Sequence, residues 1–174
     1  MSDKALGKIG LARYLLILLV TLLTACSGEV EMGHLDVRDG LTYLKNSKIP
    51  YTGPVVSYFP PKDEDEEPKL YMSGQFVSGR REGVWNYYSW NGERREVRYA
   101  LGRQHGLARW FFTQDRKKRD QEFRNGRAHG GGTWWDQKGD STAHDYYRYG
   151  SKVPYPQPED RAKFEQEEKD PKPL

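Results

Sequence analysis

The chain has 174 residues, a length that allows one domain of ordinary size and argues against two large folded units. Charged residues make up 30% of the chain, yet aromatic residues reach 13%, which is too many for a simply disordered polar chain. Basic and acidic residues are nearly balanced at 28 and 25, which argues against a nucleic-acid-binding protein. The single cysteine excludes an intramolecular disulfide.

The first 26 residues have the layout of an export signal. An apolar run extends from Tyr14 to Leu23 and closes on the tetrapeptide Leu23-Thr24-Ala25-Cys26. Three basic residues precede it, namely Lys4, Lys8 and Arg13. The segment from Tyr14 to Cys26 is shorter than the roughly 20 apolar residues that a helix needs to cross a bilayer. We therefore expect a signal helix rather than a stable membrane span.

The tetrapeptide resembles the lipobox of bacterial lipoproteins, and the only cysteine of the chain occupies the lipobox position. The resemblance implies a signal peptide over residues 1–25 and a mature chain that begins at Cys26, which carries two or three acyl chains. Such an anchor is practically permanent. Ser27 follows the cysteine, which favours the outer membrane of a cell that has two membranes. An ordinary signal peptide and an uncleaved anchor are the alternatives.

A repeat of 23 to 24 residues organises the middle of the chain. Each copy has an aromatic residue, a glycine three places later and a second glycine four places after the first. The copies begin at Phe76, Tyr99, Phe123 and Tyr147, and the fourth has Pro154 in place of its second glycine. The complete glycine pairs are Gly79 and Gly83, Gly102 and Gly106, and Gly126 and Gly130.

The pattern predicts one β-hairpin per repeat. An aromatic pair follows each second glycine, and a turn residue comes at the ninth place, as Gly92, Asp115 and Gly139. The paired glycines are expected to form the second connection, where the backbone bends into the next hairpin. Alternation places Val97 and Tyr99 on one side of a strand, with Glu96, Arg98 and Ala100 on the other.

Aromatic residues dominate the apolar content of this region. Residues 76–150 hold fifteen aromatics but only five of Val, Ile, Leu and Met, which is a poor composition for a two-layer core. We expect an all-β fold in which repeated hairpins form an open, single-layer, twisted antiparallel sheet with rings stacked along one face. An N-terminal signal helix precedes this sheet, and a disordered C-terminal tail follows it.

The repeats resemble the MORN repeat variant of bacterial proteins described as YwqK-family antitoxins. The likeness covers residues 36–150, including a degenerate opening half-repeat, Asp39-Gly40-Leu41-Thr42-Tyr43 followed by Pro50-Tyr51-Thr52-Gly53. It implies the hairpin architecture and, for function, an antitoxin-like protein. Three features depart from the pattern: Asp115 stands at a turn where glycine is usual, Pro154 replaces a glycine, and residues 60–69 form an acidic insertion.

The resulting organisation has four parts. Residues 1–25 are the signal peptide, 26–35 a tether, 36–153 the MORN-like repeats with the acidic insertion 60–69, and 154–174 a polar tail. Proline cannot donate to a strand ladder, so the sheet is expected to end at Pro154. A capping role is the alternative for the tail.

No catalytic motif or cofactor motif unites the reactive side chains. The possible metal ligands are His34, His105, His129 and His144. His105 and His129 hold equivalent places in successive repeats, about 10 Å apart, which is too far for both to bind one ion, so we expect no metal site. The acidic run from Asp63 to Glu67 lacks the spacing of a dedicated calcium loop, so a solvated loop is expected there.

Two groups of residues are candidates for binding a partner. The first is a basic cluster, Arg116, Lys117, Lys118 and Arg119, within a region that holds 15 basic and 9 acidic residues between 76 and 150. The second is the tryptophans Trp85, Trp90, Trp110, Trp134 and Trp135. The alternatives are a solubilising charged rim and rings that stack only with each other.

These observations favour a non-enzymatic, lipid-anchored module of the cell envelope that binds another protein or an anionic envelope component. An antitoxin-like protein that neutralises an envelope or extracellular toxin is the second hypothesis, carried by the resemblance alone. A wall-glycan enzyme that uses Glu96 and Glu122 as paired acids is the third. No cofactor, metal or nucleic acid is expected.

Overall fold

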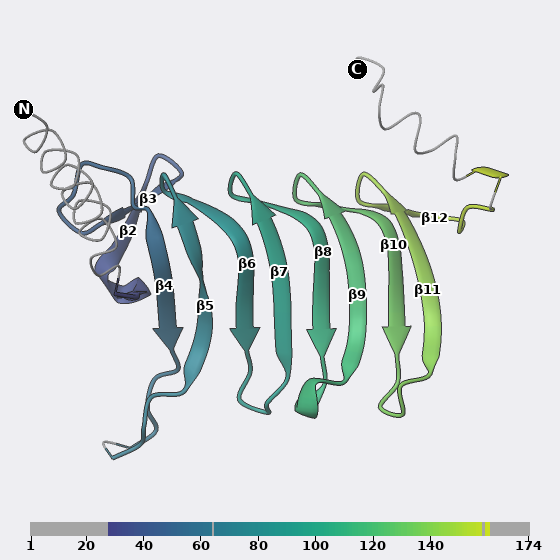
Figure 1. Ribbon diagram of the computed structural model, residues 1–174, viewed down its shortest axis with the longest axis horizontal. Coiled ribbons are helices and arrows are strands. Elements are labelled where there is room, and N and C mark those ends of the chain that lie inside the picture. Colours follow the sequence, from purple (N-terminus) through teal and green to yellow (C-terminus); the bar gives the residue numbers. More distant parts are fainter. Residues whose placement is uncertain (1–27, 64, 158, 161–174) are drawn as a thin grey trace, which may run out of the picture.

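The protein, described here by a computed structural model of residues 28–63, 65–157 and 159–160, is all-β over this part of the chain. Ten strands form one long open sheet, and two more form a separate hairpin (Figure 1). The expected open sheet of hairpins is therefore confirmed. The signal helix, Cys26 and the tail beyond residue 160 lie outside the described residues.

The large sheet follows the chain, with each strand beside the next from β4 to β12. Its strands are β1 (Val30–Glu31), β4 (Gly53–Tyr58), β5 (Leu70–Val77), β6 (Arg80–Tyr88), β7 (Arg94–Ala100), β8 (Arg103–Phe111), β9 (Lys117–Arg124), β10 (Arg127–Trp135), β11 (Ser141–Arg148) and β12 (Ser151–Val153). β12 ends directly before Pro154, whose missing amide hydrogen prevents further pairing.

The N-terminal edge differs from the antiparallel expectation. β1 pairs with β4 in parallel, whereas every other pair among the described strands is antiparallel. Parallel neighbours need a crossover rather than a tight turn. The crossover consists of the 3-10 helix η1 (Met32–His34) and the hairpin of β2 (Leu35–Arg38) and β3 (Leu41–Leu44).

The first glycine of each repeat closes a two-residue hairpin turn. Gly79, Gly102, Gly126 and Gly150 have φ values of 75°, 83°, 84° and 95°, and the residue before each also has positive φ. Two successive positive φ values define the type I′ turn, which matches the twist of the flanking strands. The amide of each glycine also donates to the preceding hairpin, as from Gly126 to the Gln104 carbonyl at 2.8 Å. We call this end of the sheet the tight-turn edge.

The ninth-place turns lie at the opposite end, which we call the wide-turn edge. They span residues 89–93, 112–116 and 136–140, and each is closed by a hydrogen bond between its end residues. The ninth-place residues Gly92, Asp115 and Gly139 all have positive φ, as expected. The second of these turns, residues 112–116, contains the 3-10 helix η2 (Thr113–Asp115).

The second glycines correct one expectation, because they do not share a connection with the first. Gly83, Gly106 and Gly130 lie inside β6, β8 and β10, with φ values of 70°, 84° and 85°. The pairing with β5, β7 and β9 is irregular at these places, which is the signature of a β-bulge. Figure 1 shows the three strands bending sharply near their starts.

The bend gives the sheet an inner face, which carries Arg81, Trp85, Val97 and Gln121. Arg81 and Tyr87 are six residues apart on β6, about 20 Å in a straight strand. The Arg81 Nη1 nevertheless donates to the Tyr87 hydroxyl at 3.2 Å, so their side of β6 is the inside of the bend. The outer face carries the side chains that alternate with these along each strand, such as Glu96 beside Val97 on β7.

One row of the inner face forms the core. Trp85, Val97, Ala108 and Gln121 follow one another across β6 to β9, and all four are buried. Val97 and Tyr99 therefore lie on the same side of β7, as predicted, and this side faces the core. Trp85 has 0% exposure, and its indole Nε1 donates to the Gln75 carbonyl at 3.2 Å. The core thus combines rings with a few aliphatic side chains, such as Val55 and Val97.

Two glycines make room for the large residues of this row. A Cβ at Gly74 would lie 2.2 Å from the Trp85 Cδ2 atom, and one at Gly132 would lie 2.4 Å from the Gln121 Oε1 atom. Contacts below 3 Å are not tolerated without a shift of the neighbour. Because Gly74 of β5 and Gly132 of β10 have no side chain, Trp85 of β6 and Gln121 of β9 can be buried against them.

The flanking segments cover the first strands. Leu35 of β2 is part of the buried core cluster with Val55 and Trp85, and Met32 of η1 packs against that cluster. The acidic insertion extends from the wide-turn edge and is held at its base, where the Phe59 and Trp90 rings lie 4.4 Å apart.

Candidate interaction surface

A row of alternating rings and cations crosses the inner face beside the core. Its members are Tyr87, Arg95, Trp110, Arg119 and Trp134, one from each strand from β6 to β10, and each is directly paired with the next. All five are only partly buried. We call this set the ring–cation row.

The members of the row contact each other as cation–π pairs. The guanidinium carbon of Arg95 lies 4.5 Å from the centre of the Tyr87 ring. The guanidinium of Arg119 lies between two indoles, 5.0 Å from Trp110 and 4.2 Å from Trp134. These distances are within the roughly 6 Å over which a ring face attracts a cation. The Arg119 Nε is buried and has no hydrogen-bond partner among the described residues.

Alternation along β9 corrects the expectation of a single basic cluster. Arg119 faces inward, whereas the Lys117 Nζ lies on the outer face, 4.7 Å from the Trp135 ring and 3.7 Å from an Asp120 carboxylate oxygen. Lys118 is paired with Glu93 at 2.7 Å, and Arg116 donates to the Gln137 carbonyl. Four consecutive cations therefore point in different directions and do not form one patch.

Trp85 must also be withdrawn from the candidate contact residues, because it has no exposed surface. Trp110 and Trp134 belong to the ring–cation row. Trp135 lies on the outer face, and Trp90 is 44% exposed at the wide-turn edge, where Lys62 and Lys69 lie over its ring. The five predicted tryptophans thus divide among the core, both faces and one edge.

The N-terminal end of the row is held by hydrogen bonds among Tyr87, Tyr99 and Arg81. The Tyr87 and Tyr99 hydroxyls are 3.2 Å apart, and Arg81 donates to both. Burial, followed by the hydrogen bond with Tyr99, raises the pKa of Tyr87 well above its ordinary value. Tyr87 therefore presents a neutral phenol to a partner at physiological pH.

The C-terminal end of the row is fixed by Asp145 of β11. Its carboxylate accepts a hydrogen bond from the Trp134 indole Nε1 at 3.1 Å and pairs with the Lys152 Nζ at 2.5 Å. The hydrogen bonds from Lys152 and then from Trp134 lower the pKa of Asp145. A carboxylate whose folded pKa is depressed stabilises the fold above its unfolded pKa of about 3.9 and loses this effect as the pH falls through the folded value.

We therefore expect acid to release Trp134. The indole proton resonance of Trp134 should shift as the pH falls below about 4, because protonation weakens Asp145 as an acceptor. The variant Asp145→Asn cannot titrate and should give a flat profile at the same resonance. Two-dimensional NMR of both proteins checks this, and an identical transition in the variant would contradict the assignment.

The reactive side chains do not converge on a catalytic or metal site. No group of three His, Cys, Asp or Glu residues is close enough to hold a metal ion within the described ranges. Glu96 lies on β7 and pairs with Arg94 and with Arg109, whereas Glu122 lies on β9, with β8 between them. The proposed acid pair is therefore two strand spacings, or about 10 Å, apart.

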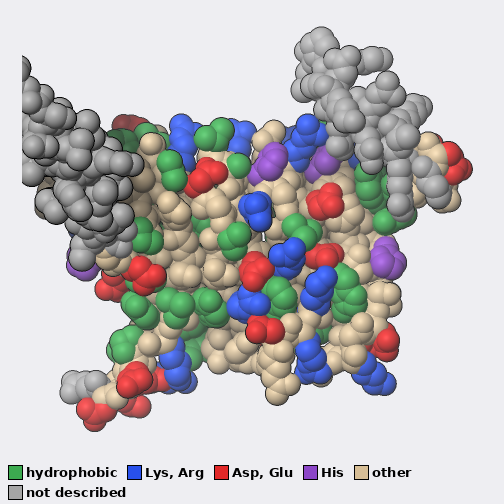
Figure 2. Space-filling model, in the orientation of Figure 1, with side chains coloured by type: hydrophobic (Ala, Val, Ile, Leu, Met, Phe, Trp, Pro, Cys, Tyr) green, Lys and Arg blue, Asp and Glu red, His purple; other side chains and the backbone are tan. Residues whose placement is uncertain are grey.

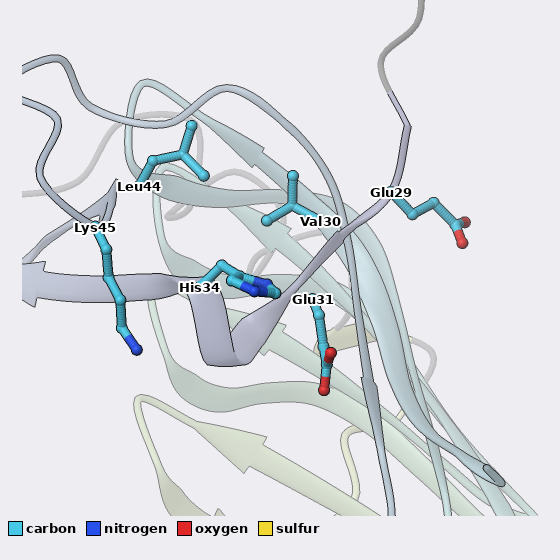
Figure 3. Close-up of a pocket in the computed structure, with 6 residues that line it drawn as sticks. All are labelled: Glu29, Val30, Glu31, His34, Leu44 and Lys45. Carbon is cyan, nitrogen blue, oxygen red and sulfur yellow. The ribbon is translucent and has the colours of Figure 1, made fainter.

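A separate pocket of about 560 Å³ lies beside the start of β1. Figure 3 shows Val30, His34 and Leu44 around it, while the Glu29 carboxylate points away from the other labelled side chains. Its polar groups do not converge on a common point. The pocket lies at the start of the described residues, which begin at Gly28, and we assign no ligand to it.

The sequence contained a signal for the ring–cation row that the search for catalytic motifs missed. Basic residues recur directly after the wide turns, as Arg94-Arg95 and as Lys117-Lys118-Arg119. In an antiparallel sheet, this place lies opposite the aromatic pairs of both neighbouring strands. The third wide turn is followed by Ser141-Thr142-Ala143, so the row ends at β10.

Comparison with known protein families gives no matching family model, and comparison with curated proteins gives no match either. No helix among the described residues has the length and apolar character required to cross a membrane. The geometry of the repeats is therefore the basis for any functional assignment.

Proposed function

We propose that the protein is a MORN-like repeat lipoprotein of the bacterial cell envelope, anchored through Cys26, whose inner face binds another protein without catalysis. The observation that carries this proposal is the ring–cation row, which stays partly exposed across five strands. The repeated hairpins agree with the architecture that the MORN resemblance implies. The lipobox tetrapeptide supports the anchor.

The chemistry of the row suits a protein partner. Tryptophan, tyrosine and arginine are the residues that most often dominate the binding energy of protein interfaces. At 4.7–4.9 Å per strand, the row is about 19 Å long, which is enough to contact a strand or loop of five or six residues. An open sheet leaves this row accessible along its length.

Arg95 and Arg119 define the polarity of the partner. Neither makes an ion pair with a described residue, and the one side-chain hydrogen bond that Arg119 donates there goes to the Gln121 Oε1 atom at 3.3 Å. A guanidinium that lies over a ring keeps its edge free for a carboxylate or carbonyl oxygen. We therefore expect an extended segment with acidic side chains, whose oxygens satisfy the two arginines while its apolar groups cover Trp110.

Photo-crosslinking from neighbouring residues of β11 tests this proposal. Ala143 is exposed beside Trp134 at the end of the row, and His144, also exposed, pairs with Thr133 and so points to the opposite face. A photoreactive amino acid at position 143 should give a discrete adduct in intact cells, and the same group at 144 should not. The adduct should fall at least tenfold when Trp110→Ala and Arg119→Ala are combined.

The comparison of faces makes this experiment decisive. The two crosslinking sites are adjacent in sequence, so expression, anchoring and mobility are matched. Equal adducts from both positions, or an adduct at 143 that persists in the Trp110→Ala, Arg119→Ala variant, would contradict binding through the inner face.

A further inference from the structure

Three arginines line the tight-turn edge at equivalent places. Arg80, Arg103 and Arg127 are the first residues of β6, β8 and β10, each directly after a turn glycine. Their strands alternate with β7 and β9, so they are spaced about 10 Å apart along the edge. Figure 2 shows basic side chains along the upper edge of the molecule, where Figure 1 places the tight turns.

These arginines have no partner within the part of the chain that the structure describes. All three are exposed, and none takes part in an ion pair or a side-chain hydrogen bond there. By contrast, Arg94 and Lys118, near the wide-turn edge, are paired with carboxylates. The tight-turn edge therefore presents a line of three unpaired arginines, with one carboxylate among them, that of Glu82, which accepts a hydrogen bond from the Leu101 amide at 2.9 Å.

Exposed apolar side chains project from the same edge. Leu101 and Tyr149 precede turn glycines and are 73% and 55% exposed. Both adopt positive φ, at 51°, a conformation that bulky residues rarely take and that Asn or Gly would serve with less strain. Local turn chemistry does not explain a leucine at this place. An amphipathic surface such as lipid headgroups can contact these apolar side chains.

The direction of β1 brings the start of the chain to this edge. β1 is parallel to β4, with Val30 opposite Val55, and β4 begins at Gly53 beside the first tight turn. Thr52, just before Gly53, accepts a hydrogen bond from the Ser78 amide of that turn at 2.8 Å. Gly28 and Glu29, the described residues that precede Val30, therefore leave the sheet toward the tight-turn edge. Cys26 is only four residues before Val30, a span of at most about 14 Å.

We propose that the tight-turn edge docks on the anionic lipid surface of the membrane that holds Cys26, with Arg80, Arg103 and Arg127 on the headgroups. This inference rests on the proposed lipid anchor. Figure 1 shows the tight turns in one row along the same edge, and basic residues near an anionic membrane each contribute about 1 kcal/mol. The acidic insertion extends from the wide-turn edge and so points away from the negative surface.

Site-specific labelling of the full-length lipoprotein tests this orientation. Because Cys26 is the only cysteine and is blocked by lipid, a cysteine introduced by Ser78→Cys at a tight turn or by Gln137→Cys at a wide turn can be labelled alone. Each fluorescent protein is reconstituted into vesicles that carry a nitroxide quencher on the headgroups. Vesicles of phosphatidylcholine alone are compared with vesicles that also contain phosphatidylglycerol.

We expect strong quenching at position 78 with phosphatidylglycerol and little at position 137. Replacing Arg80, Arg103 and Arg127 together by glutamine should lower the docked-to-undocked ratio about a hundredfold and abolish that quenching, while the protein stays in the membrane fraction. The matched control, Arg116→Gln with Lys117→Gln and Lys138→Gln, should keep it.

The outcomes separate the two proposals. Failure of the protein to remain with vesicles after an alkaline wash would overturn the lipid anchor. If the protein is retained, three results would overturn docking through the tight-turn edge. These are equal quenching at both positions, no quenching at position 78, and quenching that the arginine replacements leave unchanged.

Discussion

Trp85→Ala is expected to lower the free energy of unfolding by about 3–5 kcal/mol, the largest loss for any single truncation in the sheet. Trp85 is fully buried, and its ring is surrounded by Phe76 at 5.1 Å, Tyr99 at 6.0 Å and the Arg81 guanidinium at 4.7 Å. Phe76 and Leu35 belong to the same buried cluster, so the truncation removes contacts at the centre of the core. Urea unfolding followed by far-ultraviolet circular dichroism measures the loss.

Trp90→Ala is the matched control, because it removes the same side chain from an exposed position. Trp90 is 44% exposed and contacts mainly Phe59, Lys62 and Lys69, so we expect a loss of about 1 kcal/mol or less. Equal losses in the two variants would mean that Trp85 is not the centre of the core.

Gly74→Ala should destabilise the protein by about 1–3 kcal/mol through overpacking. The new Cβ would lie 2.2 Å from the Trp85 Cδ2 atom and 2.4 Å from the Cε2 atom, so the indole must leave its position. If this contact is the cause, the substitution should cost little when Trp85 is already alanine. A double-mutant cycle by urea unfolding measures that coupling.

Gly131→Ala provides the comparison for backbone effects. Gly131 also lies inside a strand, β10, but a Cβ there would meet nothing within 4 Å, and its φ is not positive. We expect a change of at most about 0.5 kcal/mol. Two results would contradict this explanation: a loss of stability in Gly131→Ala as large as in Gly74→Ala, or additive effects of Gly74→Ala and Trp85→Ala. Either result would mean that steric contact with Trp85 is not the reason why Gly74→Ala is destabilising.

The repeat made the hairpin architecture predictable, because turn residues and strand alternation are local properties. Positive φ at Gly92 and Gly102 follows from the need for tight reversals, and the buried side of Val97 and Tyr99 follows from a period of two. The role of Gly106 was harder to infer. A glycine can serve either a turn or a bulge, and only the pairing of β7 with β8 distinguishes the two.

The candidate surface could be predicted only in part, because it depends on contacts between strands. The run Arg116 to Arg119 reads as one patch in the sequence, yet alternation and a bulge in β9 separate its side chains. Trp85 stands two places after Gly83 and Trp110 four places after Gly106, and only the pairing between strands assigns the first to the core and the second to the ring–cation row. The parallel pairing of β1 has no local signal at all.

The lipid anchor at Cys26 is the premise that the envelope function and the docking orientation share. Labelled-palmitate incorporation in cells that express the full-length protein tests it most directly. We expect the label in the wild-type protein at the mature size and none in Cys26→Ala, which should accumulate as the longer precursor. Equal labelling of both proteins, or labelling of neither, would contradict this account.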